Sequence, residues 1–381
     1  MNEFFPIADS SYGLIRPGDS QDFSVCFPSP IAIGASADPD TAYEAASLIA
    51  QSAAMQGIPL LLTPAVNRFS NIHDARRGLC FTDDPSRNAD LAAAWVQGLQ
   101  ENGVGAILRL LATDDPTDLD VLKKVIERVA PCAVATDMAP ILDIPILPDT
   151  LQQPLTEAFD TSIQRAGFFL RMPEEFDWGM QHHQARKLAR RGIVLLKNEN
   201  KLLPIHGNPK IAMIGAAAQT PCFQPDGLPP VHCTETLSAL QAVRSVSPVR
   251  FAMGYDQEER TINETILHEA VSLAADSDLT ILFLQAKGTN SDSVLSLPSA
   301  QENLLKTIAQ VQKHTIVVLH TDRPVQLPWI DLVSGLVVAF PGGQAGGAAV
   351  IDLLFGAVPF SGKLPFAFPH PAFKTDLGLF V

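Results

Sequence analysis

Apolar and polar residues follow one another along this chain in blocks that predict short buried strands separated by amphipathic helices. Strand and helix patterns alternate through the first half. Parallel strands need crossover connections, and helices usually supply them, so this order favours a parallel α/β sheet. The strands predicted there are 30–34, 58–64, 104–111 and 132–136, and the helices are 40–55, 86–102 and 117–129.

The second half repeats the alternation with strands that consist almost entirely of Val, Ile and Leu, which indicates burial on both faces of a sheet. We expect a turn held by apolar residues at 194–205 and an irregular, proline-rich segment at 138–153. A domain boundary near 175–185 divides the chain into 1–180 and 181–381. The predicted strands are 210–215, 249–254, 279–285, 315–320 and 335–340, and the helices are 184–192, 235–246, 262–276, 299–312 and 344–354.

Composition and charge narrow the class of protein. Hydrophobic residues make up 46% of the 381 residues, which excludes intrinsic disorder. The net charge of −14 disfavours nucleic-acid and anionic-membrane partners. The first residues lack the pattern of a signal peptide, and no apolar stretch approaches the ~20 residues of a membrane span. We therefore expect a soluble cytoplasmic protein.

The cysteines and histidines do not suggest a metal centre. Five cysteines are scattered without a CxxC pair, so inert, partly buried thiols are expected; a catalytic thiol would need an activating base. His182 and His183 are adjacent on a predicted helix, where neighbouring side chains diverge, and we expect them to be solvated. The cysteines are Cys26, Cys80, Cys132, Cys222 and Cys233.

The glycine-rich segment PGGQAGG at 341–347 lies between a predicted strand and a predicted helix. Such a turn can bind phosphate at a helix N-terminus, but the spacing matches neither a P-loop nor a dinucleotide fingerprint. We expect the glycines to serve tight turning and close helix packing. His320 and Asp322 end another predicted strand, where a supporting or turn role is expected.

Carboxylates follow two predicted strands of the first half. Asp9 comes after FFPIA and Asp137 after CAVAT. Ligands of parallel barrels and open α/β sheets bind at the carboxyl ends of the strands, where two carboxylates can do acid/base or nucleophilic chemistry. Asp also caps helices and turns, and from spacing alone that second interpretation is favoured.

Several segments together resemble glycoside hydrolase family 3, which includes many β-glucosidases, β-xylosidases and N-acetyl-β-hexosaminidases. The resemblance implies a TIM-type (β/α) barrel followed by an α/β/α sandwich domain, chemistry carried by carboxylates, and no metal or organic cofactor. SGKLPFAFP at 361–369 is a specific signature of the second domain. The segments are 185–205, 210–218, 295–305 and 340–369 for the sandwich, and 27–39 and 62–107 for the barrel.

Three substrate-binding residues carry over by this resemblance. Asp9 in DSSYG stands where the family's D-G-P-x-G segment has its sugar-binding Asp, and Arg76 matches the Arg of the G-R pair. Arg109 stands in place of the Lys of the K-H pair, with Leu110 in place of the His. A sugar hydroxyl facing Leu110 would lose a partner. We expect Leu79, Leu110 and Cys80 to make the cavity around the three binding residues more apolar and partly cationic.

The catalytic groups are less well matched. Asp137 is the closest counterpart of the family's nucleophile, although it lies closer to Arg109 than the family spacing implies. The loop 285–298, where the acid/base is expected, contains no Glu, and Asp292 is its only carboxylate. In the first hypothesis Asp137 attacks the anomeric carbon and Asp292 or a borrowed carboxylate protonates the leaving oxygen, at the ~5–5.5 Å separation of retaining enzymes.

Two alternatives remain open. In the second hypothesis the chain is repurposed for a non-sugar or glycosylated small molecule in biosynthesis, and in the third it is a non-catalytic binding protein. An eightfold barrel takes ~250 residues and at least ~200, but only about 180 precede the sandwich. The barrel is therefore shortened or incomplete. Its open edge needs cover from the other domain, from 138–153 or from a second subunit, and we expect a homodimer.

Overall fold

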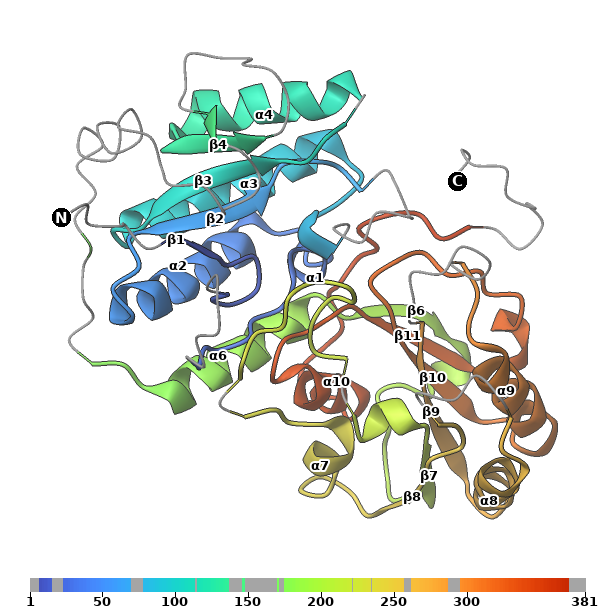
Figure 1. The fold of residues 1–381 in the computed structure, drawn as a ribbon. Helices are drawn as coiled ribbons and strands as arrows, with labels where there is room; N and C mark the ends of the chain where they lie inside the picture. Colours follow the sequence, from blue (N-terminus) through green and yellow to red (C-terminus); the bar gives the residue numbers. More distant parts are fainter. Residues whose placement is uncertain are drawn as a thin grey trace.

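The computed structural model describes residues 7–15, 23–69, 78–113, 115–136, 146–147, 170, 175–220, 222–233, 235–256, 262–286 and 295–369. Its strands form two sheets, which Figure 1 shows side by side with the N-terminal sheet in blue to green. We call them the barrel-type sheet, from the first half of the chain, and the sandwich sheet, from the second half.

The barrel-type sheet consists of five parallel strands in sequence order. Within the described residues it is open rather than closed into a barrel. Helices α2, α3 and α4 each begin at an Asp N-cap followed by Pro at the first helical position, a strong start signal. The strands are β1 (Ile7–Asp9), β2 (Leu60–Ala65), β3 (Gly105–Leu110), β4 (Ala133–Thr136) and β5 (Ile146–Leu147), and the helices are α2 (Pro39–Met55), α3 (Pro85–Glu101) and α4 (Pro116–Val129).

The first predicted strand is wrong, because residues 30–34 form a short helix, α1 (Pro30–Gly34). Ser29 has extended backbone angles and Pro30 occupies the first helical position, where its fixed φ suits a helix. All five residues are buried, so no polar face marks the helical period and the run is indistinguishable from a buried strand. In the segment predicted to be irregular, 146–147 is a strand, and the rest of 138–153 lies outside the described residues.

The sandwich sheet has the order β6-β11-β10-β9-β7-β8, in which only β6 is antiparallel to its neighbour. One face packs against α7 and α10 and the other against α8 and α9, which makes an α/β/α sandwich. The strands are β6 (Val194–Asn198), β7 (Ile211–Ile214), β8 (Val249–Ala252), β9 (Leu279–Gln285), β10 (Thr315–His320) and β11 (Gly335–Ala339), and the helices are α7 (Ala239–Val243), α8 (Glu264–Ala275), α9 (Ser299–Val311) and α10 (Gly346–Leu354).

Segment 194–205, predicted to be a turn, starts as strand β6 and then continues as a 3-10 helix at Glu199–Lys201. The remaining helices and strands predicted for the second half are present, most with ends shifted by a few residues. No helix within the described residues is both long and apolar enough to cross a membrane.

Helix α6 (Trp178–Arg191) lies between the two sheets and packs against α10 on one side and against α1 and α2 on the other. Arg186 and Arg190 of α6 both bind the buried carboxylate of Asp352 on α10, with nitrogen–oxygen distances of 2.5–2.7 Å. On the other side, Arg191 binds Glu44 of α2 at 2.7 Å. Ion pairs in both directions therefore make α6 the connector between the two halves.

Candidate functional site

Two of the predicted binding residues meet at the carboxyl edge of the barrel-type sheet. Asp9 is the last residue of β1, and Nη1 of Arg109 lies 2.9 Å from its Oδ2. Leu108 and Leu110, on either side of Arg109 in β3, belong to the core beneath the helices. Because side chains alternate along a strand, the Arg109 guanidinium is on the opposite, inner face of the sheet. Both side chains are largely buried, at 10% and 20% exposed for Arg109 and Asp9.

Tyr12 lies beside this ion pair. Burial raises the pKa of its hydroxyl well above the usual range, and the Asp9 carboxylate adds to the shift. The hydroxyl therefore stays protonated, and it donates a 2.7 Å hydrogen bond to the carbonyl oxygen of Pro229. Ser11 donates weakly to Asp9 through its backbone N–H and its hydroxyl, at 3.4 and 3.5 Å to Oδ1. The carboxylate therefore contacts Ser11 through Oδ1 and Arg109 through Oδ2.

The strand ends at this edge are tied together by Asn67, which the sequence did not single out. Its amide donates to the carbonyl of Leu111 and to Asp118, and its Oδ1 accepts from the N–H of Leu111 at 2.7 Å. These bonds join the residues after β2 to the residue after β3. They hold the end of the strand that carries Arg109. The sequence pointed to Asn67 only through the polar stretch that follows strand β2.

Two buried hydroxyls near the same edge have no hydrogen-bond partner within the described part of the chain. Ser10 follows Asp9 directly, and Thr63 follows Leu62, the residue paired with Asp9 across the sheet. Both residues are 0% exposed. Buried hydroxyls are normally hydrogen-bonded to protein, water or ligand. The edge beside Asp9 therefore offers unused donors and acceptors.

The other predicted site residues, Arg76, Asp137 and Asp292, lie outside the described residues. The strand that precedes Asp137 in the sequence is described. Thr136, the last residue of β4, pairs with Leu110 at the end of β3. Residue 137 therefore follows a strand that ends next to the strand of Arg109.

Models of one family match both halves of the chain. The glycosyl hydrolase family 3 N terminal domain matches residues 15–120, and the glycosyl hydrolase family 3 C-terminal domain matches residues 193–377. The chain belongs to glycoside hydrolase family 3. Residues 121–192 lie between the two matches.

Relatives of this family 3 chain include a thermostable beta-glucosidase B of Acetivibrio thermocellus, 25% identical over 91% of this chain and 58% of that protein. That alignment runs over 436 positions, whereas 91% of 381 residues is about 347, so about 90 positions have no residue in this chain. An exo-alpha-(1->6)-L-arabinopyranosidase of Bifidobacterium breve is 31% identical over 51% of this chain and 28% of that protein. The chain thus spans well under two thirds of these curated relatives.

Solved structures show the same fold. The GH3 beta-glucosidase of Bifidobacterium adolescentis superposes with a TM-score of 0.81 at 23% identity, covering 95% of this chain and 66% of that one. DesR, a beta-glucosidase from Streptomyces venezuelae solved in complex with D-glucose, gives 0.78 at 18% identity, covering 96% and 73%. A TIM-like unit followed by an α/β sandwich is therefore the architecture of this family 3 chain.

The expectation that Leu110 faces the binding pocket of this family 3 chain is wrong. Leu110 is fully buried among residues of α3 and α4, on the face of β3 opposite Arg109. Cys80 is also turned elsewhere, into an apolar cluster with Phe69 and Phe366. Leu79 does pack with Tyr12 and so lies near the Asp9–Arg109 pair. Adjacent residues of a strand face opposite sides of the sheet, so Arg109 and Leu110 cannot both face the pocket.

The glycine-rich turn of the sandwich domain packs closely, as expected for its glycines. It contacts the first half of the chain at Cys26. Gly343 has a φ of +71°, and a Cβ on it would lie 2.4 Å from the carbonyl oxygen of Cys26. Gln344 is 1% exposed and exchanges hydrogen bonds with the backbone of Cys26, at 2.8 and 3.0 Å. Its amide nitrogen lies 2.9 Å from Nδ1 of His182.

His182 is therefore not solvated as expected. Its ring nitrogen contacts Gln344 and the Glu235 carboxylate, and burial lowers its pKa. His183, next to it on α6, is exposed. Among the described residues, no three His, Cys, Asp or Glu side chains gather as a set of metal ligands.

His320 and Gln285 occupy the carboxyl edge of the sandwich sheet as register partners of β10 and β9. His320 is 5% exposed, and burial lowers its pKa to about 4, so the ring is neutral at pH 7. Nδ1 of His320 and both amide atoms of Gln285 have no hydrogen-bond partner within the described residues. His320 lines a cavity of about 10 Å³ against the glycine-rich turn, which is room for about one water molecule.

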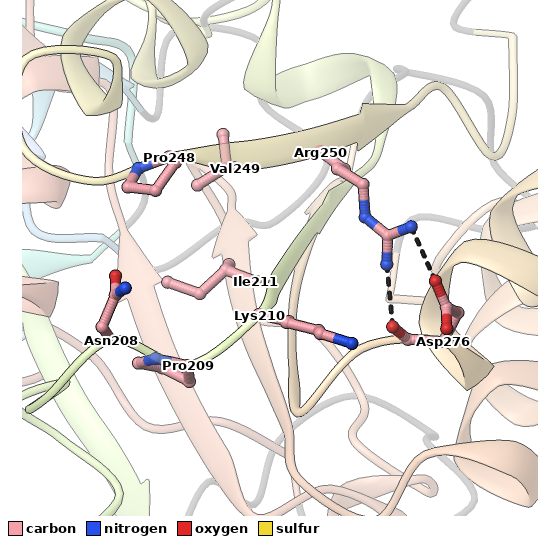
Figure 2. Close-up of a pocket in the computed structure, with 8 residues that line it drawn as sticks. All are labelled: Asn208, Pro209, Lys210, Ile211, Pro248, Val249, Arg250 and Asp276. Carbon is pink, nitrogen blue, oxygen red and sulfur yellow. Dashed lines mark hydrogen bonds and ion pairs between the residues drawn. The ribbon is translucent and has the colours of Figure 1, made fainter.

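A larger depression, of about 410 Å³, lies at the amino ends of β7 and β8 and is drawn in Figure 2. Its polar wall is an ion pair in which Arg250 donates to Asp276 at 2.7 Å. Ligands of parallel α/β sheets bind at the opposite, carboxyl edge. The depression is therefore no part of the candidate site, which lies around Asp9 and Arg109.

Proposed function

We propose that this chain is a β-glucosidase-like glycoside hydrolase that binds a sugar at the Asp9–Arg109 pair and cleaves an O-glycosidic bond. The observation that carries the proposal is the meeting of these two side chains at the carboxyl edge of the barrel-type sheet. A carboxylate accepts hydrogen bonds from sugar hydroxyls and a guanidinium donates them, and charged partners make the stronger bonds. The named β-glucosidases among its relatives and structural neighbours support this choice of substrate class.

In this proposal Asp137 is the nucleophile. It follows β4, whose last residue pairs with the last residue of the Arg109 strand, so the register favours a position close to the bound sugar. The Asp137 carboxylate displaces the leaving group at the anomeric carbon while Asp292, on the loop after β9, gives its proton to the leaving oxygen. Water then releases the sugar from Asp137, with Asp292 taking the water's proton.

The test is a panel of aryl β-glycosides with leaving groups of graded acidity. We expect turnover by the wild type and its loss for all leaving groups in Asp137→Asn. Asp292→Asn is expected to lose more activity towards poor leaving groups than towards activated ones, because a good leaving group needs no proton. Asp9→Asn is expected to raise KM, while Asp90→Asn, an exposed position on α3, serves as the matched control.

An inactive wild type, or full activity in Asp137→Asn, would contradict this proposal. If the wild type turns over no glycoside but retains a small molecule detected by native mass spectrometry, the chain acts on another substrate. If it neither turns over a glycoside nor retains a ligand, it is a non-catalytic binding protein.

We also propose that two copies associate through the open edge of the barrel-type sheet. Within the described residues this sheet ends at β1 and at the two-residue strand β5. Unpaired strand edges need cover, and a second copy supplies it. Light scattering after size-exclusion chromatography should give twice the chain mass of 41.0 kDa at micromolar concentration, and a monomer there would reject the proposal.

A further inference from the structure

Two thiols from distant parts of the chain meet where its halves pack together. Cys26 lies between β1 and α1, and Cys233 lies in the loop that precedes α7. Both side chains pack in one cluster with Tyr12 and Val231. The chemistry proposed for glycoside cleavage uses neither thiol.

The backbone holds the two cysteines in this position. Ser24 and Cys233 pair as an isolated parallel bridge, and the N–H of Ser24 donates to the carbonyl of His232 at 2.9 Å. On the other side, the N–H of Cys26 donates to the side chain of Gln344 at 3.0 Å. A main-chain bond on one side and a bond to the Gln344 side chain on the other therefore hold the two segments in place.

The two thiols differ in access and acidity. Cys26 is 0% exposed, whereas Cys233 is only partly buried. Burial raises the pKa of the Cys26 thiol, and the hydrogen bond from Cys26 lowers the pKa of Cys233. A reachable, more acidic thiol beside a buried second thiol is the arrangement of redox-sensitive cysteine pairs.

We propose that Cys26 and Cys233 form a reversible disulfide that joins the two halves of the chain, with a low-molecular-weight disulfide such as oxidised glutathione as the oxidant. The Cys233 thiolate attacks one sulfur of the oxidant, which forms a mixed disulfide and releases one thiolate. Cys26 then loses its proton, attacks Sγ of Cys233 and releases the second thiol. Two protein thiols are oxidised and one glutathione disulfide is reduced to two thiols.

The crosslink would fix the loop that covers the Asp9 side of the candidate site. Tyr12, which lies beside Asp9, donates its hydroxyl hydrogen bond to Pro229 in the same loop as Cys233. With the disulfide formed, this loop stays attached to the segment around Cys26 even when the packing between the two halves loosens. The oxidised protein is therefore expected to melt at a higher temperature than the reduced protein.

To test this, the reduced full chain is incubated in buffers with an increasing ratio of oxidised to reduced glutathione. Its peptides are then mapped without a reducing agent. We expect free thiols to fall from five to three, with a single link between the peptides of Cys26 and Cys233. The melting temperature should rise in parallel and return after dithiothreitol. Cys132→Ala is the matched control, because Cys132 is a buried thiol whose pKa is raised to about 12 by burial, and it should behave as the wild type.

The order of attack gives a second readout. Cys26→Ser should accumulate a glutathione adduct at Cys233, whereas Cys233→Ser should form no adduct at Cys26 and no disulfide. Five free thiols at the most oxidising ratio would overturn the proposal, as would a link between other cysteines. Peptide mapping of the wild type decides the matter even if Cys26→Ser does not fold, and no readout depends on glycosidase activity.

Discussion

The guanidinium of Arg109 reaches the carboxylate of Asp9 across an intervening strand. Nη1 of Arg109 and Oδ2 of Asp9 are 2.9 Å apart, although β2 separates β1 from β3 in the sheet. The pair therefore joins the ends of β1 and β3 at the carboxyl edge of the barrel-type sheet. Substituting either residue is therefore expected to lower the stability of the fold.

Asp9→Ala is expected to lower the free energy of unfolding by about 2–3 kcal/mol, somewhat less than the ~3–5 kcal/mol of a fully buried ion pair, because Asp9 is partly exposed. Arg109→Gln should cost a similar amount, and the double variant less than the sum of the two. Urea denaturation of the four proteins measures this coupling. Asp120→Ala, which breaks the exposed pair with Lys123, should change stability by under ~0.5 kcal/mol, and additive losses would argue against the pair.

Leu110→His should destabilise the chain by about 2–4 kcal/mol and leave any glycosidase KM unimproved. The side chain is buried in the apolar core under the helices, where an imidazole finds no polar surroundings. Leu110→Met, which keeps the volume, should cost less than ~1.5 kcal/mol. Denaturant unfolding of both variants, together with their KM for an aryl glycoside, tests the orientation of the Leu110 side chain. A stable Leu110→His with a lower KM would mean that residue 110 faces the sugar.

Gln344→Met should lower the free energy of unfolding by about 2–3 kcal/mol, because the N–H of Cys26 loses its acceptor inside the contact between the halves. Hydrogen exchange should show faster exchange around Cys26 and in the loop before α7, where Leu237 donates to the carbonyl of Gln344. The exposed Gln97→Met on α3 is the control, with a change within ~0.5 kcal/mol. Equal changes in the free energy of unfolding for the two substitutions would show that Gln344 does not stabilise the contact.

His320 should make the folded state weaken as pH falls below about 6.5. Its folded pKa is lowered to about 4 by burial, from an ordinary value of 6.5, so the unfolded chain binds the proton more readily. This contribution to stability is complete above pH 6.5 and is lost progressively down to pH 4, by up to about 3 kcal/mol. The slope of unfolding free energy against pH should flatten in His320→Phe. The exposed His314→Gln should retain it, and an unchanged slope in His320→Phe would refute the assignment.

Much of the fold could be predicted because its elements carry local signals. The Asp–Pro pairs at the starts of α2, α3 and α4 and the apolar runs of β9 and β10 are readable from neighbouring residues. Helix α1 could not be predicted, because five buried residues have no polar face to reveal a period. Strand β6 resembles a loop in sequence and is a strand only because β11 pairs with it.

The candidate site was predictable in part for the same reason. Asp9 and Arg109 carry over from family motifs, and the structure brings them together. Asn67, Tyr12 and Gln344 were missed, because each acts through a partner tens to hundreds of residues away in the chain.

By itself, the sequence determined the family and the alternation of strands and helices. These follow from local composition, motifs and periodicity, which every segment carries on its own. Only the tertiary structure decided that Arg109 faces Asp9 while Leu110 faces the helices, and that Cys26 meets Cys233. Such contacts depend on strand register and on the packing of the two halves, and no short stretch of sequence records either.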